Sequence, residues 1–123
     1  MAGALTIKGV EDTEELPVGP ALDVPGRPVA MFAPGHTGGH CILHLPDRDT
    51  VISGDALVTL DPYTGATGPQ IVASAATADT ARAMESLGPV AATGASTVLP
   101  GHGDPWTHGV DAAVGHARAV GEH

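Results

Sequence analysis

Three side chains that commonly ligate metals, His36, Asp55 and His102, each follow a short apolar stretch and a glycine, in the sequences PGH, SGD and PGH. Each apolar stretch has the composition of a strand, so the three side chains fall at strand ends. Imidazole and carboxylate groups placed there suit Zn²⁺ or a similar divalent ion, because a sheet fixes them and glycine lets the backbone turn close to the ion. A carboxylate can also bridge two ions. The pattern predicts that all three residues are metal ligands.

Each of these residues also has an ordinary explanation when it is taken alone. A histidine in a glycine-rich loop is commonly a polar turn residue, and an aspartate after glycine is commonly a turn or cap residue. Two copies of Pro-Gly-His on either side of a Gly-Asp are less expected as scattered turns. The combination therefore favours a metal site.

A second histidine pattern suggests a different kind of zinc site. His36, His40 and His44 are four residues apart, as on the metal-binding face of a zinc-protease helix. However, Gly38 and Gly39 disfavour a helix, and no glutamate lies between the histidines. The spacing therefore does not predict a protease helix.

Nucleophilic catalysis by a side chain is also disfavoured. Cys41 lies beside His40, but adjacent residues of a strand point to opposite faces, so a buried structural cysteine is the better interpretation. The sequence has no Gly-x-Ser-x-Gly turn and no glycine-rich phosphate loop.

The composition indicates one small domain with a light core. The chain has 123 residues, and its only aromatic residues are Phe32, Tyr63 and Trp106. Its net charge of −9 argues against nucleic acid and anionic membranes as partners and favours small molecules or cations. A single cysteine, no long apolar run and an acidic N-terminal region lead us to expect a cytoplasmic protein.

The first half of the sequence is typical of β-structure. We expect one domain over residues 1–123, in which residues 1–20 form a loosely packed strand and an acidic turn. A hairpin arm precedes a Pro-Gly turn at residues 25–26, and strands are expected over residues 29–32, 40–45 and 50–53.

The second half changes to helical spacing. A helix is expected to begin after an N-cap at Thr77 and to kink or stop at Gly88-Pro89. A strand over residues 97–99 and an amphipathic helix from about 109 to 120 follow. The expected order is β-β-β-β-α-β-α, which is an α/β (α+β) fold.

The stretches APGHTGGH, VISGDAL and VLPGHGDPW resemble the last three metal motifs of the metallo-β-lactamase-fold hydrolases, a superfamily that includes glyoxalase II. The resemblance extends over roughly residues 20–120. It implies an αββα sandwich with a mononuclear or dinuclear zinc site at one edge of the sheets, of which this chain would be the C-terminal half.

The resemblance also implies a role for each matching residue. His36 matches the ligand that completes the first metal site, Asp55 the aspartate that bridges two ions, and His102 the last ligand of the second site. His40 matches an imidazole that hydrogen-bonds to the ligands and orients them. In the loop after Asp55, Asp61 and Tyr63 are candidate substrate contacts. The alternative is that they are ordinary polar residues of an exposed loop.

The mechanism implied by the resemblance is hydrolysis of an ester, thioester or amide-like bond. A metal-bound hydroxide would be the nucleophile, Asp55 would bridge or orient it, and the cation would stabilise the oxyanion. Iron and manganese suit the same His/Asp ligands as zinc.

The main metal motif of the family, H-x-H-x-D-H, has no counterpart, since no histidine precedes His36. Half of a sandwich would also leave an apolar sheet face uncovered. Four interpretations remain open. The chain is part of a hydrolase that acts with a complementary N-terminal half, it forms a homodimer that rebuilds the sandwich, it is a non-catalytic metal-binding or interaction module, or it is a remnant without function.

Overall fold

A four-stranded mixed sheet organises the molecule. The computed structural model describes residues 9–123, and the strands are β1 (Val29–Phe32), β2 (Cys41–Leu45), β3 (Thr50–Gly54) and β6 (Thr97–Pro100). Their order in the sheet is β1-β2-β3-β6, antiparallel except for the parallel pair β3 and β6. All three strands that precede the candidate metal ligands are therefore in one sheet.

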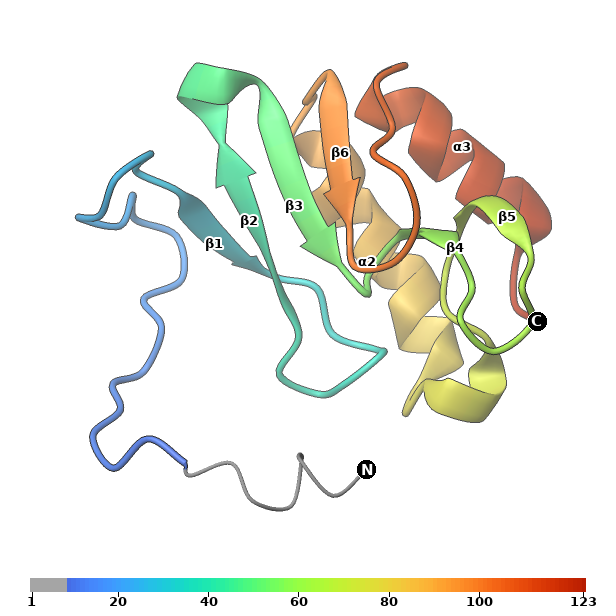
Figure 1. Ribbon diagram of the computed structural model, residues 1–123, viewed down its shortest axis with the longest axis horizontal. Coiled ribbons are helices and arrows are strands. Elements are labelled where there is room, and N and C mark those ends of the chain that lie inside the picture. Colours follow the sequence, from blue (N-terminus) through green and yellow to red (C-terminus); the bar gives the residue numbers. More distant parts are fainter. Residues whose placement is uncertain (1–8) are drawn as a thin grey trace.

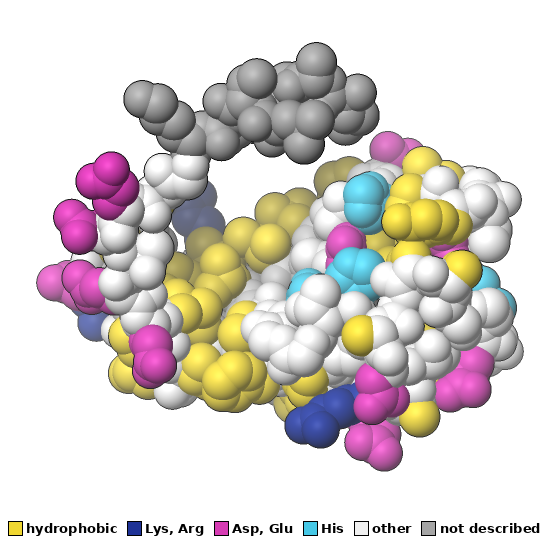
Figure 2. All heavy atoms as spheres, turned by 90° about the horizontal axis from the view of Figure 1, so that it is seen from below, with side chains coloured by type: hydrophobic (Ala, Val, Ile, Leu, Met, Phe, Trp, Pro, Cys, Tyr) yellow, Lys and Arg dark blue, Asp and Glu magenta, His cyan; other side chains and the backbone are white. Residues whose placement is uncertain are grey.

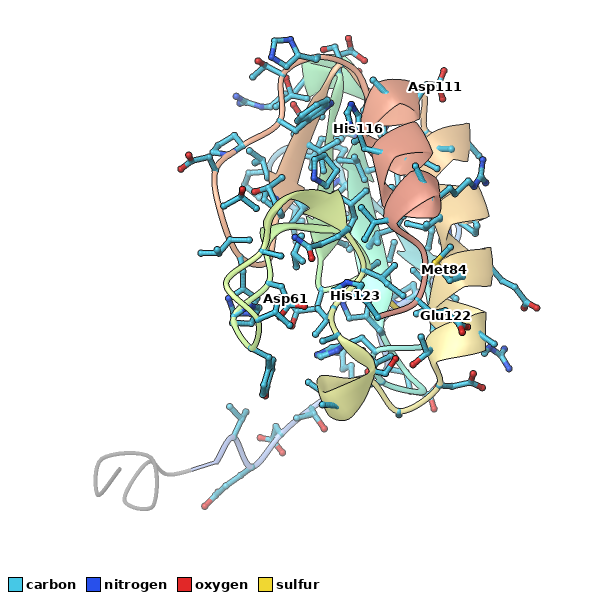
Figure 3. All side chains as sticks on the ribbon, turned by 90° about the vertical axis from the view of Figure 1, so that its right-hand side faces the viewer. Asp61, Met84, Asp111, His116, Glu122 and His123 are labelled. Atoms are coloured by element: carbon cyan, nitrogen blue, oxygen red, sulfur yellow. The ribbon has the colours of Figure 1, made fainter. Side chains whose placement is uncertain are left out.

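Two helices cover one face of this sheet. They are α2 (Thr80–Ala92) and α3 (Val110–Val120). In Figure 1, α2 lies behind the sheet and α3 lies beside β6, and Figure 3 shows both helices on one side of the sheet. Alternate strand residues point toward them. The fully buried side chains of the strands and helices include Ile42, Val51, Val98, Leu87, Val90 and Val114. The core thus lies between the helices and one face of the sheet.

The other face of the sheet carries apolar side chains that remain exposed. The register pairs Leu43 with Ile52 and Ile52 with Leu99, so these three residues share that face. Phe32 is 58% exposed, Ile52 37% and Leu99 38%. Figure 2 shows hydrophobic side chains in a hollow between the acidic N-terminal segment and the rest of the molecule. The expected uncovered apolar face is therefore present in the described part of the chain.

The N-terminal region differs from the expected hairpin arm. Residues 1–8 of the expected first strand lie outside the described residues, and residues 9–20 form no strand. The Pro-Gly turn is present, with the N–H of Arg27 donating to the Val24 carbonyl at 2.9 Å. The arm before it pairs with β1 through an isolated bridge between Ala21 and Val29 rather than as a strand, and the Gly19 N–H donates to the Ala30 carbonyl at 3.0 Å.

Helix α2 begins later and ends later than the sequence predicts. Its N-cap is Asp79, whose carboxylate accepts from the Arg82 N–H at 3.0 Å, whereas the Thr77 hydroxyl donates to the Val72 carbonyl. The helix continues through Pro89 to Ala92, so the expected stop at Gly88-Pro89 is wrong. Proline removes one hydrogen bond, and its ring crowds the carbonyl four residues earlier. That residue, Glu85, is exposed, so its carbonyl can tilt outward and be solvated by water.

A small second sheet replaces the loop expected after Asp55. It consists of β4 (Val58–Leu60) and β5 (Thr67–Gln70), which pair in antiparallel fashion. The hairpin packs beside α3. The strands are too short to produce a clear alternation in the sequence, so the loop interpretation missed them.

The buried carboxylate of Asp61 holds the turn of this hairpin. Its Oδ1 accepts from the N–H groups of Tyr63 and Thr64 at 2.8 and 3.3 Å, and its Oδ2 accepts from Ala73 at 2.9 Å. The ring of His123 lies 3.9 Å from Oδ2, and Figure 3 shows these two side chains next to each other. Asp61 thus ties the hairpin to the segment that leads to α2.

Replacement of Asp61 by asparagine is expected to lower the free energy of unfolding by about 3 kcal/mol, because an amide N–H would face the N–H of Ala73. Urea unfolding at neutral pH measures this loss. Asp23→Asn, which changes an exposed carboxylate, is the control. Equal stability of the two variants would contradict the role of the buried carboxylate.

The same carboxylate predicts a loss of stability in acid. Burial alone raises the pKa of Asp61, but the N–H groups of Tyr63, Ala73 and Thr64 outweigh burial and hold the pKa below the usual 3.8. A depressed folded-state pKa stabilises the protein above the unfolded-state value, and this stabilisation is lost as the pH falls through the folded-state pKa. The free energy of unfolding, measured in urea from pH 5 downward through the folded-state pKa, should therefore change less with pH in Asp61→Asn than in the natural chain.

Within residues 9–123, no helix combines the length and the hydropathy needed to cross a lipid bilayer.

Candidate metal centre

Three loops at one edge of the main sheet bring His36, Asp55 and His102 together. They follow β1, β3 and β6, respectively. The Nε2 atom of His36 lies 3.1 Å from Oδ2 of Asp55, and the Nε2 atom of His102 lies 3.4 Å from Oδ1. Asp55 is thus the centre of the cluster, and each imidazole contacts a different oxygen of its carboxylate.

Solvent reaches this cluster unevenly. The side chain of His102 is 44% exposed, whereas those of His36 and Asp55 are 21% and 25% exposed. His102 is therefore the member of the cluster most open to an incoming molecule.

Two glycines allow the loops to approach Asp55. Gly54 has a φ of +51°, and a Cβ there would lie 2.8 Å from Nε2 of His40. Gly101 donates its N–H to the Gly54 carbonyl at 2.7 Å, and a Cβ on Gly101 would collide with Oδ1 of Asp55. The glycine beside each ligand in the sequence is a signal for this close approach.

His40 supports the cluster through the backbone. Its Nε2 accepts from the Asp55 N–H at 3.0 Å, and its ring meets that of His36 edge to face, with 6.2 Å between the centroids. Burial and then the nearby His36 lower the pKa of His40, while Asp55 and the Ala33 backbone oppose this shift. The imidazole is therefore neutral, with its proton on Nδ1 and its lone pair facing Asp55.

Two buried ring nitrogens in this cluster make no hydrogen bond to any part of the chain that the structure describes, residues 9–123. They are Nδ1 of His36 and Nδ1 of His40, neither of which makes a hydrogen bond of ordinary geometry. The Ala33 backbone still raises the pKa of His40, although its contact with the ring does not have the geometry of an ordinary hydrogen bond. Unpartnered buried polar atoms are uncommon in proteins. Because Nδ1 of His40 carries the proton of that ring, it is a hydrogen-bond donor and not a candidate metal donor.

The donor atoms fit part of a two-ion site. Within residues 9–123, no group of three or more His, Cys, Asp or Glu side chains is arranged to hold one ion. The cluster instead offers two pairs of donors, His36 with Asp55 Oδ2 and His102 with Asp55 Oδ1. Both donor types are right for zinc, iron or manganese, but a catalytic zinc ion usually has three protein ligands. An ion held by either pair would therefore need further ligands from outside residues 9–123.

The structure separates the other candidate residues from this cluster. Asp61 is buried, and its carboxylate is occupied by backbone N–H groups. Tyr63, in the turn between β4 and β5, is 68% exposed. His44 lies within β2 and pairs in register with Val29 and Val51.

One family model and several solved structures are similar to this chain. A family model described as the metallo-beta-lactamase superfamily matches residues 5–102. Among solved structures, a metallo-beta-lactamase family protein from Thermus thermophilus is 25% identical, with a TM-score of 0.62 over 89% of this chain and 34% of that chain. A beta-lactamase domain protein from Burkholderia ambifaria is 25% identical, with a TM-score of 0.65 over the same shares of the two chains.

A more distant solved structure shares the fold. TTHA1623 in a di-iron-bound form is 24% identical, with a TM-score of 0.55 over 82% of this chain and 47% of that chain. The present chain thus spans only about one third to one half of the length of these structures. No curated protein matches it in the sequence comparison.

Proposed function

Because the chain belongs to the metallo-beta-lactamase superfamily, whose members are generally metal-dependent hydrolases, we propose that it contributes to metal-dependent hydrolysis of an ester, thioester or amide-like small molecule. The observation that carries this proposal is the contact of His36 and His102 with different oxygens of Asp55. A carboxylate shared in this way suits two neighbouring ions.

In this proposal, His36 and Asp55 hold one ion, and His102 and Asp55 hold the other. Zinc is our first choice, and the di-iron form of TTHA1623 supports iron as an alternative. When bound, such an ion supplies a Lewis acid that polarises the scissile group and lowers the pKa of water to ~7.

The side chains of this chain position the reaction. The Asp55 N–H is held by the neutral ring of His40, which fixes the carboxylate between the two imidazoles. Asp55 Oδ1 and Oδ2 supply the negative charge that binds cations. The solvent-exposed side of His102 is where we place the incoming substrate.

We further propose that ligands from outside the described residues complete the site. The described residues give each ion only one imidazole and one carboxylate oxygen, and the apolar face with Phe32, Ile52 and Leu99 belongs to the same sheet. Either a complementary N-terminal half or a second copy of this chain would cover that face and supply ligands. A homodimer would show twice the chain mass in light scattering, and Leu99→Asn should shift it toward the monomer.

A second candidate function is a non-catalytic metal-binding or interaction module. It is favoured by the incomplete ligand set and the open apolar face. Under this alternative, Ile52→Asn would abolish partner binding, whereas Asp55→Ala would leave it nearly unchanged. Under the hydrolase proposal, Asp55→Ala would abolish hydrolysis of a nitrophenyl ester or a thioester without changing the assembly.

The first test is the zinc content of the purified chain by elemental analysis, measured after incubation with zinc and removal of the excess. We expect bound zinc in the natural chain, with less in His36→Ala and in His102→Ala. His108→Ala, which changes an exposed histidine outside the cluster, is the matched control. Equal zinc contents in all variants would overturn the ligand assignment, whereas a chain without bound zinc would show that these residues bind the ion only when the site is completed from elsewhere.

Replacement of His40 by alanine is expected to weaken zinc binding about 10-fold to 100-fold without changing the number of bound ions. The variant removes the acceptor for the Asp55 N–H but no proposed ligand. Competition with a zinc chelator measures the affinity. His40→Gln, whose amide oxygen can accept the same bond, should recover part of the loss. Full affinity in His40→Ala would show that His40 does not position Asp55.

A further inference from the structure

A hollow of about 330 Å³ lies between the β4–β5 hairpin and the loop that follows His102. It is separate from the Asp55 cluster, but its wall begins at Gly103, the residue directly after His102. Its size is at the lower end of the range for small-molecule sites. The residues other than glycine that line it are Thr59, Leu60, Thr67, Pro69, Asp104, Pro105 and Trp106.

The walls of this hollow are held in place by hydrogen bonds. The Thr59 hydroxyl donates to the Asp104 carbonyl at 2.7 Å, and the N–H groups of Thr59 and Leu60 donate to the His102 carbonyl at 3.0 and 3.3 Å. The loop packs so closely that a Cβ on Gly103 would collide with Thr59. The hairpin and the loop therefore form one preformed surface.

The indole of Trp106 is fixed as part of this surface. Its backbone exchanges two hydrogen bonds with Val98 of β6, at 2.8 and 2.9 Å, and its Nε1 donates to the Gly109 carbonyl at 2.8 Å. The rings of His108 and His116 contact it edge to face, with centroids 5.1 and 5.5 Å away. A rigid, partly exposed aromatic wall loses little entropy when a ligand binds.

The lining is apolar with one ionisable group. Leu60, Pro69, Pro105 and Trp106 supply apolar surface, and Leu60 is 38% exposed. Among the described residues, Asp104 is the only ionisable one that lines the hollow, and the whole chain carries a net charge of −9. These charges attract a cation and repel an anion, and an aromatic wall adds to the attraction of a cation.

We propose that this hollow binds a small molecule with an apolar body and an ammonium group, with the apolar body against Trp106 and the ammonium group near Asp104. The site is independent of the metal ions. That such a molecule is the side group of the hydrolysed substrate rests on the proposed function and on the position of Gly103 next to His102.

The test uses the emission of Trp106, which is the only tryptophan in the sequence. The full chain, stripped of metal with a chelator, is titrated with phenethylamine, with the neutral 2-phenylethanol and with the anionic 3-phenylpropionate. We expect a saturable change with the amine at about tenfold lower concentration than with the alcohol, and none with the acid. Equal responses to the three probes, or no saturable change with the amine, would overturn the proposal.

Two variants and a control locate the ligand. Asp104→Asn should weaken amine binding to the level of the alcohol, while Asp111→Asn, an exposed carboxylate on α3, should leave it unchanged. Thr67→Phe fills the hollow from an exposed position of β5 and should abolish binding of both probes without changing the melting temperature. Unchanged amine binding in either Asp104→Asn or Thr67→Phe would contradict the proposed position.

The outcome does not depend on hydrolysis. The titration is made without metal, so it tests the amine site alone. A chain that binds the amine but has no hydrolase activity would support the amine site and contradict the proposed function. A chain that binds zinc at Asp55 but not the amine would support the metal site and contradict the amine site.

Discussion

The Asp55→Ala variant is expected to lose both proposed ions, with an affinity for zinc at least ~100-fold lower than that of the natural chain. The reason is that one carboxylate serves both imidazoles, since His36 contacts Oδ2 and His102 contacts Oδ1. Removal of one histidine takes away one donor pair, whereas removal of Asp55 takes away a donor from each pair.

Zinc stoichiometry from elemental analysis and affinity from chelator competition measure this loss. Asp47→Ala, which removes an exposed carboxylate from the short helix Pro46–Arg48, is the matched control. Thermal unfolding should be similar in both variants, since the Asp55 side chain is 25% exposed and lies outside the core. Retention of two ions by Asp55→Ala would show that this aspartate does not bridge them.

Replacement of Gly35 by alanine is expected to lower the free energy of unfolding by roughly 3–5 kcal/mol. Gly35 has a φ of +142°, and a Cβ on it would collide with the backbone of Ala83 in α2. The added methyl group would thus strain the loop that carries His36 and push it away from the helix. The loss combines backbone strain with overpacking.

Gly38→Ala is the matched control in the same loop, because a Cβ at that position meets no atom within 4 Å and its φ is not positive. Urea unfolding of the two variants gives the difference directly. Similar stabilities would mean that the His36 loop does not pack against α2 as described.

Much of the main sheet was predictable from the sequence. The strands β1, β2, β3 and β6 and the helix α3 appear close to their expected ranges, because apolar runs ended by glycine, proline or aspartate mark strand ends clearly. The metallo-beta-lactamase superfamily expected from the three motifs is confirmed by the family model.

The missed features depend on contacts that local patterns do not record. The extension of α2 beyond Pro89 depends on the burial of Val90 against the core. The β4–β5 hairpin depends on the buried carboxylate of Asp61, which in the sequence resembles an exposed loop residue. The proximity of His36, Asp55 and His102 was expected from their strand ends, but the division of one carboxylate between two imidazoles depends on side-chain positions that the sequence does not record.

The topology of the main sheet implies an order in which the cluster assembles during folding. β1, β2 and β3 are joined by short connections, so the loops that carry His36 and Asp55 can meet early. His102 arrives only when β6 pairs with β3 after the crossover through α2, a contact of large sequence separation that forms more slowly. In stopped-flow refolding we therefore expect the contact between His36 and Asp55 to form before the contact between His102 and Asp55. The second contact would form only when the fold is complete.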